Sequence, residues 1–167
     1  RCVRSIDSSI KAVVIPRGLM DTVSEPQMKR IFRYYVDGGT LLFLNPDGAR
    51  VHKVVGYYNA GDFLKVGTTA MDPAANLLAL ETRYRQGERS ADLLRTLTEA
   101  KSAAVDASSV ELANDYLKTQ TDLGTPENMD FIMHYVEDPY AKGFRFLQEK
   151  RAAFEARFSQ KEVKKKI

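Results

Sequence analysis

The side chains best suited to nucleophilic, redox or metal chemistry are few in this chain of 167 residues. There is one cysteine, Cys2, and there are two histidines, His52 and His134, which lie far apart in the sequence. One thiol forms neither an internal disulfide nor a sulfur-rich metal site, and no zinc-ligand spacing surrounds the histidines. The sequence therefore predicts no bound metal and no cofactor.

Each of these side chains has a chemical and a structural interpretation. Cys2 is either a reactive or resolving thiol or an incidental terminal cysteine, and the lack of a second thiol favours the incidental one. We expect His52, which alternates with hairpin residues, to lie on the surface of a strand. We expect His134 to be a part-buried, hydrogen-bonded residue of a helix rather than a catalytic base.

Motifs of the common enzyme classes are missing from the sequence. It contains no paired carboxylates at a defined spacing, no phosphate-binding G-x-x-x-x-G-K loop and no G-x-S-x-G nucleophile motif. Nothing in the sequence therefore supports a hydrolase, a kinase or a nucleotide-binding protein.

Charge and hydropathy argue against a nucleic-acid partner and against a membrane span. The net charge is +3, and much of the basic excess lies in the last seven residues, KEVKKKI. Because a nucleic-acid-binding protein needs a broad basic face, we expect no nucleic-acid partner. There is no run of about 18 apolar residues, so we expect no membrane span.

The elements that must position any site change in character near residue 70. Before it, short apolar runs predict strands at about 10–16, 40–45 and 49–56, and a helix is predicted at 25–35. Because that helix joins the first two strands, we expect them to be parallel. The second and third strands should form an antiparallel hairpin, in which Gly48 takes a positive φ and forms a bulge.

Helix-capping residues dominate the chain beyond the hairpin. Asn59 is a predicted N-cap, supported by Asp62 in the first turn. Later helices are predicted to open at Asp72-Pro73, Ser90, Ser108 with Glu111, Thr125-Pro126, Asp138-Pro139 and Ser159 with Glu162. The predicted fold class is α/β followed by all-α, with one domain at 1–70 and a helical extension at 71–167. The helix lengths are similar to those of tetratricopeptide (TPR) pairs, although the signature of that repeat is largely missing.

The segment GGTLLFLNPDGARVHKVVGYYNAGDFLKV resembles the C-terminal half of a thioredoxin-fold domain. The resemblance is carried by Thr40, Phe43, Leu44 and Gly48, then Val54-Val55-Gly56, then Phe63-Leu64. The helical part is similar to extensions of some bacterial envelope thioredoxin-family proteins, notably in YRQGERS, ANDYLKTQ, TPENMDFI and KGFRFLQEKRAAF. The resemblance implies an incomplete thioredoxin-like sheet, thiol–disulfide oxidoreductase activity and a periplasmic or cell-envelope location.

Two departures from the thioredoxin pattern concern the chemistry itself. The family uses a C-x-x-C motif, and this chain has none, so we expect the motif either to lie upstream of residue 1 or to have been lost. The family also places a cis-proline just before the threonine of the hairpin strand, where this chain has Gly39 after Gly38. The resemblance implies that Gly38, Gly39 and Thr40 are the counterpart of the substrate loop, and the alternative is a simple tight turn.

Two functions stay open at this point. The chain is either part of an oxidoreductase that acts on protein thiols, if a C-x-x-C motif lies upstream, or a non-catalytic module. In the second case a redox-inactive scaffold and its helices bind a protein partner, since helical arrays commonly present surfaces for peptides.

Overall fold

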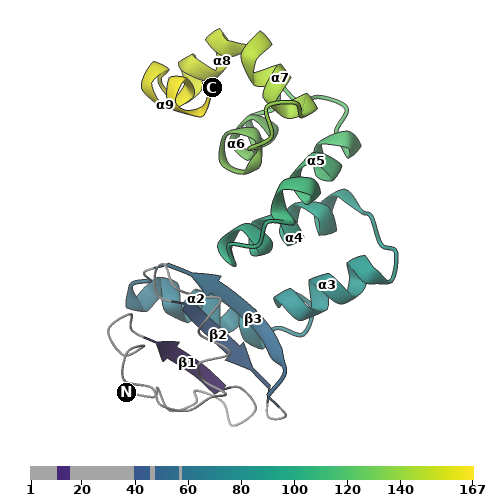
Figure 1. The fold of residues 1–167 in the computed structure, drawn as a ribbon, viewed down its shortest axis with the longest axis vertical. Helices are drawn as coiled ribbons and strands as arrows, with labels where there is room; N and C mark the ends of the chain where they lie inside the picture. Colours follow the sequence, from purple (N-terminus) through teal and green to yellow (C-terminus); the bar gives the residue numbers. More distant parts are fainter. Residues whose placement is uncertain (1–10, 16–39, 46–47, 57) are drawn as a thin grey trace. The chain divides into compact units, whose positions relative to one another are not determined.

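A computed structural model of the chain describes residues 11–15, 40–45, 48–56 and 58–167 (Figure 1). Within these residues an α/β part is followed by an all-α part, as predicted. The predicted helix at 25–35 and the predicted site residues Cys2, Gly38 and Gly39 lie outside the described residues.

The described elements are three strands followed by eight helices. The strands are β1 (Lys11–Ile15), β2 (Thr40–Leu44) and β3 (Arg50–Val55). The helices are α2 (Ala60–Met71), α3 (Leu77–Arg85), α4 (Ala91–Ala103), α5 (Ser109–Thr119), α6 (Pro126–Tyr135), α7 (Lys142–Glu149), α8 (Arg151–Arg157) and α9 (Gln160–Lys166).

The three strands form one sheet in the order β1-β2-β3, and both pairings are antiparallel. Val13 lies opposite Leu42 in the first pair. The prediction that the first two strands are parallel is therefore wrong. The crossover rule applies to strands that already run parallel in a sheet, and a connection as long as 16–39 can return the chain in either direction.

The β2–β3 hairpin shows the predicted glycine geometry and one irregularity that was not predicted. Gly48 has a φ of +88°, and its N–H donates to the Asn45 carbonyl oxygen at 3.0 Å. Further along, Phe43 pairs with His52 but Leu44 pairs with Arg50, which leaves Val51 as an extra residue in β3. This β-bulge interrupts the alternation of faces at Val51, and Val51 is buried together with its neighbour His52.

Helices α2 and α3 pack on β3 and cover one face of the sheet. The buried cluster there contains Leu41, Phe43, Val51, Val54 and Ala70, with Phe63, Val66 and Leu78 packed against it. Together these side chains form the apolar core of the sheet-containing part.

The capping residues of α2 and α3 confirm one prediction and correct another. Asn59 caps α2 as predicted, because its Oδ1 accepts the N–H of Asp62 at 2.9 Å. Asp72 ends α2 instead of opening the next helix, and α3 begins later, at Leu77, with Asn76 as its N-cap. Asn76 Oδ1 accepts the N–H of Ala79 at 2.9 Å, so it satisfies one of the free donors of the first turn.

The chain divides into two compact units, Arg1–Gly87 with Ala103–Val105, and Glu88–Ser102 with Asp106–Ile167. The predicted boundary near residue 70 precedes α3, whereas α3 packs on β3 and belongs to the first unit. The second, helical unit packs its helices mainly against their neighbours in sequence: α5 contacts α6 and α7, α6 contacts α7, and α7, α8 and α9 follow in turn.

The capping predictions in the helical unit were partly correct. Thr125 caps α6 with Pro126 in its first turn, and Ser159 caps α9. The capping box at Ser108 is wrong, since the Ser108 hydroxyl instead donates to Asp106 Oδ1 at 2.8 Å. The helix expected from Asp138-Pro139 begins at Lys142 and is interrupted at Lys150, so that α7 and α8 are separate helices.

Helix α7 lies very close to α5 and α6 at Gly143. A Cβ atom on Gly143 would lie 2.5 Å from Leu117 Cδ1 and 3.2 Å from Val136 Cγ2. Leu117 and Val136 are each only 1% exposed, so neither has room to move aside. Only glycine therefore allows α7 to pack at this distance.

Replacing Gly143 by alanine should lower the free energy of unfolding of the helical unit by about 1–3 kcal/mol, because the methyl group overpacks the interface. The matched control is Gly67→Ala in α2, where a Cβ atom would have nothing within 4 Å. That change should be stabilising by about 0.5–1 kcal/mol, the difference in helix propensity. Denaturant unfolding followed by circular dichroism measures both, and equal effects of the two substitutions would contradict the packing argument.

Candidate functional site

Thr40 is the one predicted site residue within the described chain. It begins β2, is 5% exposed, and pairs with Val55 of β3. Its Oγ1 is buried and has no hydrogen-bond partner among the described residues. The other predicted site residues, Cys2, Gly38 and Gly39, lie outside those residues.

His52 is a buried structural residue, and the prediction that it lies on the surface is wrong. It is 4% exposed, its Nδ1 accepts the N–H of Leu77 at 3.1 Å, and its ring centroid lies 6.0 Å from that of Phe43. The regular register of β2 and β3 sets His52 opposite Phe43 and on the same face as Val54, which the helices cover. Burial lowers the pKa of its imidazole from 6.5 to about 4, so His52 is a neutral link between the sheet and α3 at physiological pH.

The second histidine, His134, lies on the surface of α6. Its Nδ1 is 2.7 Å from the Asp130 carbonyl oxygen, one turn earlier in the same helix. It is hydrogen-bonded, as predicted, but exposed rather than part-buried. Within residues 11–15, 40–45, 48–56 and 58–167, no group of three or more His, Cys, Asp or Glu side chains could hold a metal ion.

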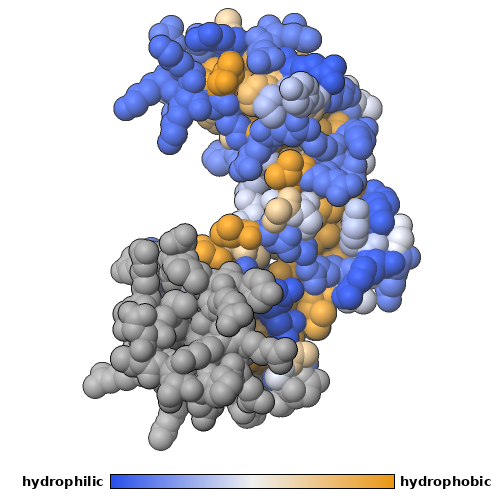
Figure 2. Space-filling model, viewed as in Figure 1, coloured by the Kyte–Doolittle hydropathy of each residue, from blue (hydrophilic) through white to orange (hydrophobic). Residues whose placement is uncertain are grey.

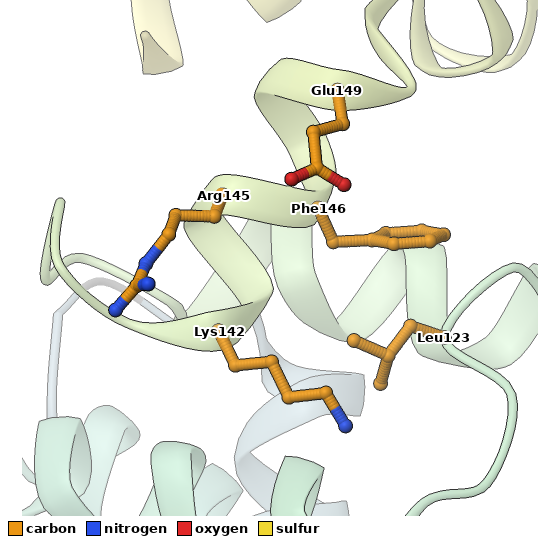
Figure 3. A pocket seen from close by; sticks show the side chains of 5 residues that line it. All are labelled: Leu123, Lys142, Arg145, Phe146 and Glu149. Carbon is orange, nitrogen blue, oxygen red and sulfur yellow. The ribbon is translucent and has the colours of Figure 1, made fainter.

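A pocket of about 280 Å³ lies on α7, in the helical unit (Figure 3). Four of its lining residues, Lys142, Arg145, Phe146 and Glu149, recur at the spacing of one helix face, and Leu123 comes from the loop between α5 and α6. This site was missed from the sequence. The helical spacing was available as a signal, but the contribution of Leu123 depends on tertiary packing.

The Leu123 side of the pocket is held in place by a buried asparagine of α6. Asn128 is 4% exposed; its Nδ2 donates to the Asp122 carbonyl oxygen at 2.7 Å, and its Oδ1 accepts from the Tyr116 hydroxyl at 2.9 Å. These bonds tie the α5–α6 loop to both flanking helices. With α7 fixed by the close contact at Gly143, both sides of the pocket are preorganised.

The charged groups of the pocket lie outside the ion pairs of the helical unit. Several acid–base pairs lie within that unit: Arg95–Glu99, Lys101–Asp106, Lys118–Asp115, Arg151–Glu155 and Arg157–Asp130. In contrast, Lys142, Arg145 and Glu149 make no ion pair with any described residue. Arg145 donates instead to a neutral acceptor, the Tyr140 carbonyl oxygen, at 2.8 Å from Nη2 and 3.2 Å from Nε.

Figure 3 shows the arrangement of these groups. The ammonium group of Lys142 and the carboxylate of Glu149 lie at opposite ends of the pocket, with the side chains of Phe146 and Leu123 between them. The visible surface of the helical unit is mostly hydrophilic with small apolar areas (Figure 2). The pocket is therefore a polar–apolar–polar site, whose ends have opposite charge.

Comparison with known proteins identifies no relative: no family model matches the chain, and neither does any curated protein or solved structure. In the part of the chain that the structure describes, no helix is long and apolar enough to cross a membrane.

The neutral state of His52 predicts a dependence of stability on pH. The unfolded chain binds a proton at His52 below about pH 6.5, whereas the folded chain does so only below about pH 4. Stability should therefore be fully present above pH 6.5 and fall as the pH drops toward 4, by about 3 kcal/mol in all. The measurement is the free energy of unfolding between pH 4 and 7 for the wild type and His52→Gln. The difference between the two should change with pH; parallel curves would rule out a buried neutral histidine.

Proposed function

We propose that this chain is part of a thioredoxin-like protein and that its helical unit binds a protein partner through the α7 pocket. The observation that carries this proposal is the α7 pocket itself, in which the charged groups of Lys142 and Glu149 lie on either side of the apolar side chains of Phe146 and Leu123. A bound partner that supplies the opposite charges and an apolar side chain would complete all of these interactions at once.

The rigidity of the pocket supports a binding function. Its walls are fixed by the Asn128 hydrogen bonds and by the contact at Gly143. A preorganised site loses little conformational entropy when a partner binds, so even a small site can give measurable affinity. The sequential packing of α5 to α9 also supports a TPR-like arrangement, in which successive helices present a surface for a partner.

Thiol–disulfide oxidoreductase activity in the cell envelope is the second candidate function. It is favoured by the order β2, β3, α2, with α2 packed on β3, because the resemblance to the C-terminal half of a thioredoxin domain rests on this segment. Thr40, with its buried hydroxyl, begins the strand that the substrate loop would precede. This function requires a C-x-x-C motif upstream of residue 1. The helical unit would then hold the protein-thiol substrate or its partner.

Partner binding predicts a selective loss on charge reversal in the pocket. The full chain, immobilised, should capture at least one protein from a bacterial envelope extract, and Lys142→Glu should weaken that capture about three- to tenfold, the effect of replacing one exposed ion pair by a repulsion. The matched control is Lys161→Glu, the same charge change on the exposed surface of α9. Quantitative mass spectrometry measures the captured proteins. Equal capture by all three proteins would reject the pocket as the binding site.

Oxidoreductase activity predicts turnover that depends on the missing motif. The protein with its upstream sequence should reduce the disulfides of insulin, measured as turbidity of the precipitating B chain. The control replaces each cysteine of the upstream motif by serine. Activity no greater than that of the control, or an upstream sequence without C-x-x-C, would leave partner binding as the only proposed function.

A further inference from the structure

We infer that the α7 pocket recognises a short extended peptide segment in which an acidic and a basic side chain flank an apolar one. This inference rests on the proposed partner-binding function and adds the chemistry of what is bound. It follows from three properties of the pocket: the separation of its charges, its volume and apolar lining, and the polarity of helix α7.

The two end charges of the pocket do not form an ion pair with one another. Lys142 and Glu149 are seven positions apart on one helix, which separates their Cα atoms by about 10 Å along the axis. Figure 3 shows the apolar side chains of Phe146 and Leu123 between the two charged groups. A ligand that bears a single charge would compensate only one end, whereas a ligand with a carboxylate and a cation compensates both.

The pocket has the size of a short peptide segment rather than of a large cofactor. Its volume of about 280 Å³ lies just below the usual range of about 300–1,000 Å³ for small-molecule sites. Phe146 is half-buried and provides most of the accessible apolar surface, and Leu123, which is 5% exposed, supports it from the α5–α6 loop. A leucine-like side chain of the peptide would pack against the ring of Phe146 and remove apolar area from water.

The orientation of the charges follows from the helix. Lys142 is the first residue of α7 and Glu149 is the last. The positive end of the helix dipole therefore reinforces Lys142, and the negative end reinforces Glu149. Arg145 adds a second positive charge one turn from Lys142, with its guanidinium directed to the Tyr140 carbonyl oxygen. The acidic side chain of the peptide consequently lies at the Lys142 end, and the basic one at the Glu149 end.

The spacing within the peptide follows from strand geometry. In an extended segment alternate side chains share one face, and each residue advances about 3.3 Å. An acidic, an apolar and a basic residue at alternate positions thus place the two charges about 13 Å apart. The Cα atoms of Lys142 and Glu149 are about 10 Å apart along the helix axis. Because lysine and glutamate side chains are long and flexible, they can bridge the difference between this distance and the spacing in the peptide.

The test uses the full chain and three pentapeptides, acetylated and amidated to remove their terminal charges. Titration followed by two-dimensional NMR should show saturable shifts of the Leu123 and Phe146 amide signals with Glu-Ser-Leu-Ser-Lys, at a Kd of about 1 mM or below. Glu-Ser-Ser-Ser-Lys, which lacks the apolar side chain, should bind about tenfold more weakly. Lys-Ser-Leu-Ser-Lys should bind about three- to tenfold more weakly than the first peptide.

A compensating substitution provides the specific readout. In Lys142→Glu both ends of the pocket are acidic, so the order of affinity should reverse and Lys-Ser-Leu-Ser-Lys should bind better than Glu-Ser-Leu-Ser-Lys. The control Lys161→Glu should keep the wild-type order. Equal affinity for the three peptides, no binding at about 10 mM, or an unchanged order in Lys142→Glu would each overturn the inference. If partner capture still depended on Lys142 in that case, partner binding would stand and only the peptide chemistry would fail.

Discussion

The close approach of α7 to α5 and α6 at Gly143 is the contact on which the arrangement of the helical unit depends. Because no side chain separates the helices there, Phe144 and Leu147 reach the core, where they are 6% and 0% exposed. The opposite face of α7 is then fixed by helix geometry, and it carries the charged and aromatic residues of the pocket. The absence of a side chain at Gly143 thus determines both how α7 packs on α5 and α6 and which face of α7 is exposed.

Two buried polar side chains have comparable roles in the two units. His52 links β3 to the first turn of α3, and Asn128 links α6 to the loop that follows α5. In each case a side chain satisfies a backbone group of another segment away from water, where an unmade hydrogen bond would cost about 1–3 kcal/mol. Such bonds are directional, so they fix the position of a loop or helix end more narrowly than apolar contacts do.

The features that could be predicted from the sequence are those decided by a few neighbouring residues. The caps at Asn59, Thr125 and Ser159 and the positive φ of Gly48 depend on local backbone geometry, and the structure confirms them. The direction of β1, the burial of His52 and the interruption at Lys150 were not predicted, because each depends on contacts between distant segments. The pocket was also not predicted, since Leu123 reaches α7 only after the helices have packed.

The regular pairing of β3 with β2 beyond its bulge makes the length of that segment a stricter requirement than its composition. Val51 is the one residue of β3 without a cross-strand partner within the β2–β3 pairing, yet both it and His52 are buried. Beyond Val51, residues 52–55 pair with β2 in regular register, so a change of length by one residue between Lys53 and Val55 would exchange the two faces of part of this segment. Many single substitutions leave this alternation intact, whereas an inserted or deleted codon there would set the imidazole of His52 and the side chain of Val54 on opposite faces of the sheet.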